Sequence, residues 1–478
     1  MTNLSGANLN NGAAAGPQGE GMDNPSSFPA YPTYKDSGVE WLGKVPDHWS
    51  VTRLGRVTGV ESGYPFPAEQ FVEVGIPVAR MSDLKEGRIN LDSIKRVEER
   101  FVPAKAMAEA DDLLIGLSGS ISNFAQVLAS DLPLAVNQRV GIVRAESSVE
   151  ATVAKYFILS RSFVCQIESA VPETTILNIS MEQVRSCALA WPPKFEQTQI
   201  ARFLDHETAR IDALIEEQQR LIELLKEKRQ AVISHAVTKG LDPTVPTKDS
   251  GVEWLGEVPA HWVKKRLKNI SPFITVGIVV NPSDYVADEG LPFLYGGEVK
   301  EGFIEVDKAR KISPEHSRQN RKTMLEAGDI VTMRVGYPGL TAVVPPECAG
   351  GNCASVMLVK RGNYDSHWLC AVMNSRLVRQ QVEVVQYGAA QKQFNIADAI
   401  EFWMFEPPIE EQTMIAEFID GQSSVFNTLM EESERSMLLL KERRSALISA
   451  AVTGKIDVRG WQPPASTQAP KFEVAEAD

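Results

Sequence analysis

The chain has 478 residues, of which 43% are hydrophobic and 23% are charged, and its formal net charge is −13. This length and composition predict a soluble globular protein of two or more domains, and the acidic balance disfavours a protein that binds DNA alone while leaving room for local basic faces or partner subunits. No apolar run reaches a membrane span, the N-terminus has no signal-peptide pattern, and five cysteines form no disulfide framework, so we expect a cytoplasmic protein with reduced, mostly buried thiols.

The two ends of the chain are predicted to be tails. Residues 1–33 are rich in Asn, Gly, Ala, Ser and Pro, and residues 456–478 have a similar composition with an acidic end. Such segments bury too little apolar surface to fold alone, so we expect disorder in the first and flexibility in the second. Between the tails the sequence repeats itself, which predicts globular domains at 34–191 and 241–406, each followed by a helix, at 192–240 and 407–455.

Each half of the chain opens on the same block. Residues 35–49 read KDSGVEWLGKVPDHW and residues 248–262 read KDSGVEWLGEVPAHW, identical at 13 of 15 positions. Trp41, Trp49 and their copies predict an aromatic clasp that packs the start of each half against a helix. His48 and His261 have no Cys or Glu recurring nearby as a ligand or dyad partner, so we expect buried, hydrogen-bonded histidines.

The regions that follow share a skeleton although they share little sequence. Residues 108–127 and 325–344 each predict a strand, a glycine turn and a second strand, with Gly119 matching Gly336. Residues 135–144 and 351–360 are strand-like, and 153–167 and 367–382 are helical in pattern. We align Asn178-Ile179 with Asn395-Ile396 as a landmark before the proline pair that opens each long helix.

The two long segments repeat without a gap. Residues 192–238 and 407–453 align at a constant shift of 215, and a helix tolerates no insertion because one extra residue rotates every later side chain by about 100°. Their apolar stripes predict an antiparallel coiled coil. The residues expected to pack between the helices are Ile211, Leu214, Ile215, Leu221, Ile222, Leu225, Val232, Phe426, Leu429, Met430, Met437, Leu440 and Leu447.

The repeat predicts an α+β protein with internal pseudo-two-fold symmetry, in which the antiparallel pair of long helices separates two α/β domains. Twin domains that keep a scaffold while their surfaces diverge suggest two recognition tasks at fixed separation. A DNA duplex presents half-sites of this kind, about 34 Å apart for one helical turn. The length of the helices would then set the separation.

The sequence resembles one known family from about Tyr34 to Arg459. The paired openings SGVEWLGKVPDHW and SGVEWLGEVPAHW, the glycine hairpins, the PP-x-x-EQ-x-x-IA-x-F-[IL]-D helix starts and the ends LKEKRQAVISHAVTKGL and LKERRSALISAAVTGKI are similar to those of the specificity subunit of type I restriction-modification enzymes. The resemblance implies that each globular domain is a target-recognition domain for one half of a bipartite, asymmetric double-stranded DNA site. It also implies two methyltransferase subunits and two restriction/translocase subunits as partners, which would carry S-adenosylmethionine, ATP and Mg²⁺.

The residues themselves predict a reader without chemistry of its own. No GxxxxGK[ST] loop and no GxGxxG after a strand occurs, and the nearest approaches to an adenine-methyltransferase motif, at 281–284 and 406–409, both fail. Asp47, the one carboxylate in the repeated block that suggested a nuclease, becomes Ala260 in the second copy. We therefore expect no catalytic residue, metal or cofactor in this chain. A protein-interaction scaffold without DNA binding and an enzyme with two divergent active sites are the alternatives.

Candidate DNA contacts follow from residue type, because Lys and Arg contact phosphates while Arg, Asn and Gln read base edges. In the second domain they are Lys264 and Lys265 in a run with Arg266 and Lys268, then Lys308, Arg310, Lys311, Arg318, Arg321 and Lys322, then Arg334, Tyr337 and Lys392. In the first domain they are Arg80, Arg88, Lys95, Arg96, Ser118, Ser120, Asn123 and Arg139. Solvated faces and turn chemistry are the alternative explanations of these residues.

Overall fold

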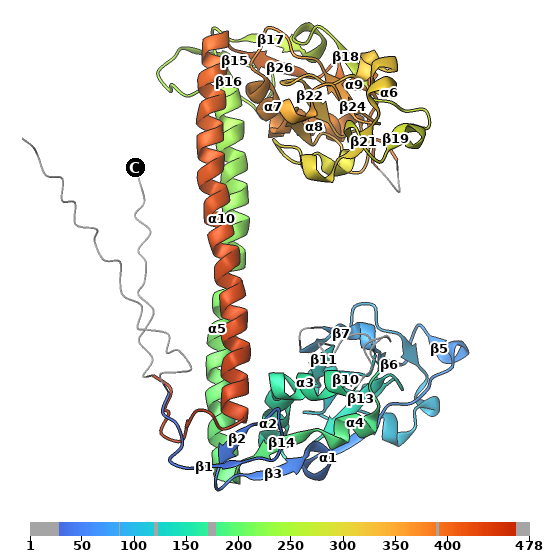
Figure 1. Ribbon diagram of the computed structural model, residues 1–478, viewed down its shortest axis with the longest axis vertical. Helices are drawn as coiled ribbons and strands as arrows, with labels where there is room; N and C mark the ends of the chain where they lie inside the picture. Colours follow the sequence, from blue (N-terminus) through green and yellow to red (C-terminus); the bar gives the residue numbers. More distant parts are fainter. Residues whose placement is uncertain (1–27, 86, 119–122, 171–177, 389–391, 465–478) are drawn as a thin grey trace, which may run out of the picture. The chain divides into compact units, whose positions relative to one another are not determined.

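The computed structural model of the chain describes residues 28–85, 87–118, 123–170, 178–388 and 392–464. It divides into two compact units, formed by residues 1–217 with 436–478 and by residues 218–435. Each unit contains one globular domain and one section of each of two long helices (Figure 1). The predicted combination of a mixed α+β class, an internal repeat and two long helices is confirmed.

The gap-free repeats form the long helices α5 (Lys194–Lys239) and α10 (Ile409–Val452). Both begin just after a proline pair, and there Gln197 and Gln412 each donate a side-chain hydrogen bond to the first proline's carbonyl at 2.9 Å. Each glutamine thus satisfies a buried backbone acceptor and fixes the direction in which the chain enters the helix. The helices predicted at 192–240 and 407–455 are confirmed, with ends that differ by at most three residues.

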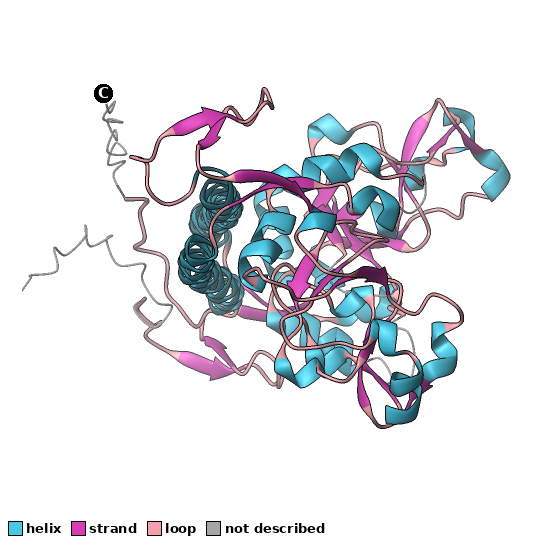
Figure 2. Ribbon diagram, turned by 90° about the horizontal axis from the view of Figure 1, so that it is seen from above, coloured by secondary structure: helices cyan, strands magenta, loops and turns pink. Residues whose placement is uncertain are grey.

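Within each unit α5 and α10 lie side by side and run antiparallel (Figures 1 and 2). In the first unit, Arg444 Nε donates to Asp212 Oδ1 at 2.8 Å. In the second unit, Arg229 Nη1 donates to Asn427 Oδ1 at 3.0 Å. From the first pair to the second, the residue number rises by 17 on α5 and falls by 17 on α10. The predicted antiparallel pairing of the two helices is therefore confirmed.

Only part of the predicted apolar stripe is buried. Ile211, Ile222, Phe426 and Leu447 are buried. Leu221 and Leu429 are 42% and 41% exposed, so their predicted packing is wrong. The remaining predicted packing residues are half-buried: Leu214, Ile215, Leu225, Val232, Met430, Met437 and Leu440. The seam between two helices is narrower than the stripe of a helix that faces a broad core, so apolar residues at its margins stay in contact with solvent.

The described part of the first domain is built around two four-stranded sheets (Figure 1). One has the order β11-β10-β13-β4 and is antiparallel, and the other has the order β12-β6-β9-β5, with β12 parallel to β6. The strands are β4 (Gly59–Ser62), β5 (Phe71–Val72), β6 (Ile76–Ala79), β9 (Arg96–Val97), β10 (Leu113–Gly116), β11 (Phe124–Gln126), β12 (Ala135–Val136) and β13 (Val140–Arg144), with a ribbon of β7 (Leu84–Lys85) and β8 (Arg88–Ile89). The helices are α1 (Leu54–Val57), α2 (Ser148–Ile158), α3 (Arg161–Ser169) and α4 (Met181–Ser186).

The second domain repeats this topology. Its sheets have the orders β18-β25-β22-β23 and β19-β21-β20-β24, and β20 is parallel to β24 as β6 is to β12. The strands are β18 (Ile274–Val276), β19 (Val286–Ala287), β20 (Leu291–Leu294), β21 (Arg310–Ile312), β22 (Ile330–Thr332), β23 (Thr341–Val343), β24 (Asn352–Cys353) and β25 (Met357–Val359). The helices are α6 (Pro314–Gln319), α7 (Ser366–Asn374), α8 (Arg376–Val385) and α9 (Ile396–Ala399). The predicted strands are confirmed as β10–β11 and β22–β23, and the predicted glycine turn is confirmed at Gly336, whereas Gly119 lies outside the described residues.

Short strand pairs close each domain beside its long helix. The first unit has the hairpin of β1 (Tyr34–Asp36) and β2 (Lys44–Pro46) and the pair of β3 (Ser50–Arg53) and β14 (Ala188–Trp191). The second unit has β15 (Thr247–Asp249) with β16 (Glu257–Pro259) and β17 (Val263–Arg266) with β26 (Trp403–Glu406). Because β14 and β26 lead directly into the proline pairs, this pairing brings both ends of each domain to the start of a long helix.

Each domain bonds to one long helix through an equivalent pair of residues. The first domain bonds to α10, and the second domain bonds to α5. In the first unit, the backbone N–H of Arg161 donates to Ser449 Oγ of α10 at 3.1 Å. In the second unit, the backbone N–H of Arg376 donates to Ser234 Oγ of α5 at 3.3 Å. Each pair lies 215 residues from its counterpart, so the pseudo-symmetry extends to the contacts between domain and helix.

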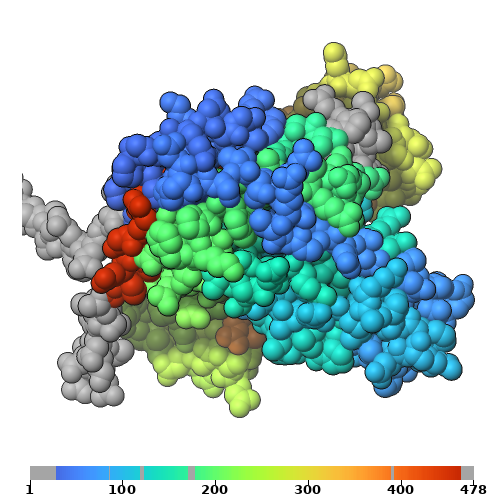
Figure 3. Space-filling model, turned by 90° about the horizontal axis from the view of Figure 1, so that it is seen from below, coloured from blue at the N-terminus to red at the C-terminus, as the bar shows by residue number. Residues whose placement is uncertain are grey.

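The described ends of the chain belong to the first unit. Tyr31 is buried, and Trp461 packs edge-on against Phe203 of α5 with ring centroids 5.3 Å apart. Figure 3 shows the first described residues and the last described ones, coloured blue and red, against the start of α5 in green. The predicted tails are therefore wrong for residues 28–33 and 456–464, because a few large apolar side chains outweigh the polar average of their surroundings. Residues 1–27 and 465–478 lie outside the described part of the chain.

Candidate nucleic-acid interface

A buried glutamate holds the opening block of the first half on α5. Glu196 Oε2 accepts hydrogen bonds from Trp49 Nε1 at 2.8 Å and from Tyr31 Oη at 2.9 Å, and Glu196 Oε1 lies 2.5 Å from His48 Nε2. Burial, followed by the nearby carboxylate, raises the pKa of the Tyr31 phenol above its ordinary value. The clasp predicted for Trp49 is confirmed, and its centre is a carboxylate that bonds three rings.

The second half repeats this arrangement. Trp262 Nε1 donates to Glu411 Oε1 at 3.0 Å, and His261 Nε2 lies 2.7 Å from Glu411 Oε2. The histidines are hydrogen-bonded as predicted, but His48 and His261 are 40% and 42% exposed rather than buried. The recurring glutamates were missed because they lie about 150 residues away from the histidines, although both stand at the EQ of the repeated helix start.

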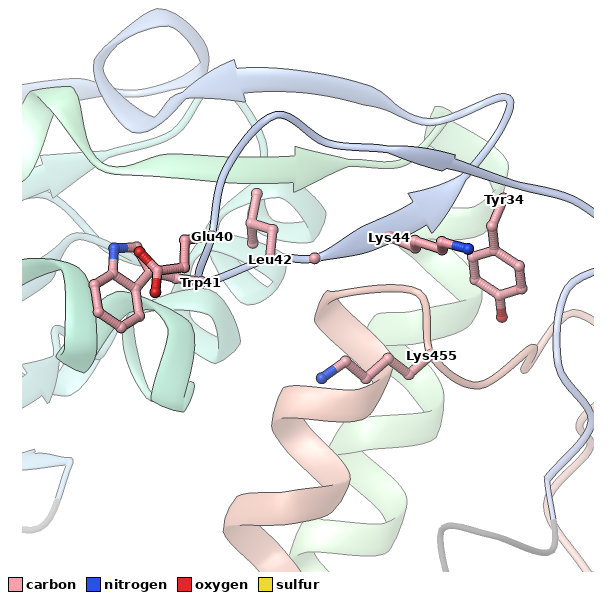
Figure 4. Close-up of a pocket in the computed structure, with 7 residues that line it drawn as sticks. Tyr34, Glu40, Trp41, Leu42, Lys44 and Lys455 are labelled. Atoms are coloured by element: carbon pink, nitrogen blue, oxygen red, sulfur yellow. The ribbon is translucent and has the colours of Figure 1, made fainter.

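Trp41 and its copy Trp254 are exposed, so the packing predicted for these two tryptophans is wrong. Trp41 stands at one end of a shallow pocket of about 380 Å³ in the first unit (Figure 4), whose lining includes Tyr34, Lys44 and Lys455. Exposed aromatic side chains are enriched at protein contact surfaces. The loop between β1 and β2 therefore exposes an aromatic side chain at the surface of the first unit.

In both domains a loop from the end of the domain pairs with the glycine hairpin. Ile179 N donates to Leu117 O at 2.7 Å in the first domain, and Phe394 N donates to Arg334 O at 3.2 Å in the second. These bonds make Ile179 the structural equivalent of Phe394. The predicted match of Asn178-Ile179 to Asn395-Ile396 is therefore wrong by two residues. Sequence identity favoured the Asn-Ile dipeptides, whereas the backbone pairing follows the shift of 215 seen in the long helices.

In the second domain this pairing brings the base-reading candidates together. Gly336 N donates to Lys392 O at 3.1 Å, and Arg334 Nε donates to Phe394 O at 3.3 Å. Tyr337 at the hairpin tip is 77% exposed, and Gly336 has a φ of +88°, which a side chain rarely adopts. Three candidates separated by up to 58 residues thus share one edge: Arg334, Tyr337 and Lys392.

The corresponding hairpin of the first domain is only partly described. Asn123 and Arg139 lie there, since Gly116 N donates to Asn123 O at 2.7 Å and Leu117 N to Arg139 O at 3.0 Å. Ser118 is buried and its hydroxyl donates to Met81 Sδ at 3.1 Å, which disfavours it as a base contact. Ser120 lies outside the described residues.

The second basic group of the second domain includes exposed cations. Arg318 on α6, Arg321 and Lys322 are exposed and follow one another along the chain. The other predicted members differ in their surroundings: Lys308 is paired with Glu305 at 2.9 Å, Arg310 lies 4.3 Å from the Tyr295 ring, and Lys311 is half-buried. The segment 318–322 is the best candidate for phosphate contacts.

The first basic run has an intramolecular role instead. Lys265 forms an ion pair with Glu406, and Arg266 and Lys268 form ion pairs with Glu401. Hydrogen bonding from Lys268, with the positive charge nearby, lowers the pKa of Glu401. Lys264 lies 4.4 Å from the Trp403 ring centroid. These contacts disfavour free phosphate contacts at Lys264 and Lys265, because Glu406 at the end of β26 and Glu401 just before that strand are acids that no count along the run could include.

The basic residues of the first domain divide in the same way. Arg80 Nε donates to the buried Asp83 at 3.0 Å, and Arg96 Nη1 donates to Gly75 O at 3.1 Å. Both guanidinium groups are therefore engaged within the domain, that of Arg80 with a side chain and that of Arg96 with a backbone carbonyl. Arg88 and Lys95 are exposed, so they remain the phosphate candidates of this domain.

No group of three or more His, Cys, Asp or Glu side chains within the described residues is placed to hold a metal ion. Of the cysteines, Cys165 is half-buried and the other four are buried, and all five are free. Burial raises the pKa of Cys353 and of Cys370 to about 12, so these thiols stay protonated at neutral pH. The prediction that the thiols are mostly buried is confirmed. The described residues include no helix that is long and apolar enough to cross a membrane.

Comparison with known protein families gives a match that covers the first domain. Residues 46–225, which span the first domain and much of α5, match the model of the type I restriction modification DNA specificity domain. The matched segment contains the hairpin of the first domain and the loop that pairs with it.

Most of the chain is similar to type I specificity subunits, as its sequence predicts. It is 23% identical to the type I restriction enzyme EcoBI specificity subunit of Escherichia coli, over 89% of this chain and 90% of that protein. It is 21% identical to the EcoKI specificity subunit of Escherichia coli strain K12, over 88% and 91%. A solved chain described in a study of the assembly and conformational transition of the type I R-M system shares the fold, with a TM-score of 0.62 at 18% identity, over 86% of this chain and 99% of that one.

Proposed function

We infer that the chain is the DNA sequence-specificity subunit of a type I restriction-modification complex, which reads a bipartite, asymmetric DNA site through its two target-recognition domains. The observation that carries this inference is the repeated backbone with different side chains. In both domains the glycine hairpin pairs with the loop before a short helix, yet Leu117 and Ser180 in the first correspond to Arg334 and Asn395 in the second. One scaffold with two chemistries is what two unlike half-sites require.

The catalytic steps are assigned to partner subunits. The relatives carry the name specificity subunit, and the resemblance implies two methyltransferase subunits that bind S-adenosylmethionine and two restriction/translocase subunits that use ATP and Mg²⁺. This chain would direct methylation and cleavage by placing those subunits on a chosen sequence. Because partners supply further phosphate contacts, its acidic balance of −13 is compatible with DNA binding.

The decisive experiment measures the affinity of the complex of this chain with its methyltransferase for DNA. Methylated adenines mapped in the host genome with and without the gene define the site. We expect binding to a duplex with this site to be at least a hundredfold tighter than to a scrambled duplex at the same salt concentration. Equal affinity for both duplexes, or methyl transfer by this chain alone, would contradict the assignment.

A further inference from the structure

Asn395 precedes the short helix α9 at the same position at which Ser180 precedes α4. Ser180 caps its helix: its Oγ accepts from Gln183 N at 3.2 Å, and Gln183 Oε1 accepts from Ser180 N at 2.7 Å. Asn is among the strongest capping residues, but the Asn395 side chain makes no capping hydrogen bond to the described α9. The side chain is therefore directed elsewhere.

The side chain of Asn395 is held by a tyrosine on the neighbouring loop. Tyr387 Oη donates to Asn395 Oδ1 at 2.9 Å. Tyr387 is itself fixed by two backbone hydrogen bonds with Gln393, one in each direction, at 2.8 and 2.9 Å. The contact sets the orientation of the amide, because Oδ1 faces the tyrosine and Nδ2 is directed away from it. Asn395 is nevertheless exposed, so the orientation is fixed at the surface.

This amide lies beside the hairpin that presents Arg334 and Tyr337. Phe394 N, one residue before Asn395, donates to Arg334 O at 3.2 Å, and Gln393 forms a β-bridge with Val335. A rigid, outward-facing amide at the edge of a recognition hairpin has the features of a base-reading group, since such groups must be held by supporting contacts in order to discriminate.

We propose that Asn395, oriented by Tyr387, reads an adenine in the half-site of the second target-recognition domain. This inference rests on the proposed function. In the major groove, adenine presents N7 as an acceptor and N6–H as a donor, and an asparagine amide matches both. Nδ2 donates to N7, and Oδ1 uses its second lone pair to accept from N6–H. Guanine presents O6 instead of N6–H, so Oδ1 fixed by Tyr387 would face another acceptor.

The test compares Asn395→Ser with Tyr387→Phe in the complex of the full chain and its methyltransferase. Asn395→Ser installs the residue that caps the counterpart helix, so it keeps the fold while removing the amide. We expect it to lower discrimination at one A·T pair of the half-site of the second domain about tenfold, the order expected for a lost bidentate contact, and to leave the other half-site unchanged. Tyr387→Phe keeps the ring and frees the amide, so the same position should lose a smaller part of its discrimination.

Methylome mapping and competition binding on duplexes altered at each position give the readout, and the melting temperature of each variant checks the fold. An Asn395→Ser complex that methylates the wild-type sequence with wild-type discrimination would overturn the role of Asn395. A wild-type half-site without an A·T pair at the affected position would overturn it as well. If the wild-type complex shows no sequence preference, the proposed function itself fails, which distinguishes the two failures.

Discussion

Glu196 and Glu411 occupy equivalent positions in the two repeats, but they should contribute differently to the stability of the fold. Glu196 is fully buried and bonds Trp49, Tyr31 and His48, whereas Glu411 is partly exposed and bonds Trp262 and His261. Removing a buried acceptor leaves its donors without partners, and this costs more than the bonds themselves contribute. The difference between the copies follows from burial, because water can replace a carboxylate only where it can reach the donors.

We therefore expect Glu196→Ala to lower the free energy of unfolding by about 2–4 kcal/mol, since it leaves a buried indole N–H and a phenol unpaired. Glu411→Ala is the matched control and should cost less than half as much. Denaturant unfolding of each variant of the full chain measures both values. Equal losses in the two variants would contradict the explanation from burial.

A second repeated contact is a hydrogen bond from a cation to a buried aspartate at the start of β10 and of β22. Asp112 accepts from Arg144 Nη2 at 2.6 Å, and Asp329 accepts from Lys360 Nζ at 2.6 Å. Both acids also accept backbone N–H groups, Asp112 from Glu109 and Asp329 from Glu326. In each domain a charge-assisted bond thus joins the residue before the first hairpin strand, β10 or β22, to the end of the neighbouring strand, β13 or β25. This contact belongs to the constant scaffold rather than to the variable tip.

At the scale of elements, the two basic segments of the second domain differ in their surroundings, and this difference predicts that only one of them contacts DNA phosphates. Arg318, Arg321 and Lys322 are exposed. In the run 264–268, three cations form ion pairs with acids of the same domain, and Lys264 lies over the Trp403 ring. Each phosphate contact contributes about −0.9 to the slope of log affinity against log salt concentration. We expect the triple variant Arg318→Ala, Arg321→Ala and Lys322→Ala to reduce the steepness of that slope by roughly two to three.

The matched triple variant Lys264→Ala, Lys265→Ala and Lys268→Ala removes the same charge and should leave the salt slope of DNA binding within about one of the wild type. Salt titrations of the complex with the methyltransferase subunit on one duplex measure both slopes. If the second variant changes the slope as much as the first, the distinction between free and paired cations is wrong.

The elements were predictable where the repeat exposed them. A constant shift of 215 is enough to locate α5 and α10, and the strand, glycine and strand pattern locates β10–β11 and β22–β23. What sequence reasoning missed depends on pairing across long distances: Glu401 beside Arg266, Glu196 beside Trp49, and Trp461 on Phe203. A count along the chain treats a basic run as free charge, but the partner of a β-strand is decided by topology.

Site residues show the same limit. Arg334 and Tyr337 were predicted from residue type and a glycine turn, and the structure places them at one edge with Lys392. In the sequence, Asn395 stands out only as a landmark of the repeat and Tyr387 does not stand out, because the signal is a missing helix cap and a hydrogen bond between side chains. Comparing structurally equivalent positions of the two domains would find such residues in other repeated proteins.

At the scale of the whole molecule, the helix pair contributes to both units. The first unit contains residues 194–217 of α5 with the end of α10, and the second contains the rest of each helix. Each unit therefore completes its core with residues from both repeats, since Leu447 of α10 belongs to the core of the first unit and Ile233 of α5 belongs to the core of the second. A mutation in one helix section should mainly affect the unit that contains it.

The antiparallel register allows the spacer hypothesis to be tested without breaking the pair. A heptad inserted between Glu217 and Gln218 of α5, together with one between Leu438 and Leu439 of α10, falls at the same level of both helices, because Asp212 pairs with Arg444 and Arg229 with Asn427. Seven residues add about 10.5 Å of helix, or roughly three base pairs. We expect the double insertion to lengthen the gap of the methylated site by about that amount while both half-sequences stay unchanged.

The single insertion in α5 alone shifts the two apolar seams against each other and should reduce methylation instead. Methylome mapping measures the gap, and an unchanged gap in an active double-insertion complex would show that the helices do not set the spacing.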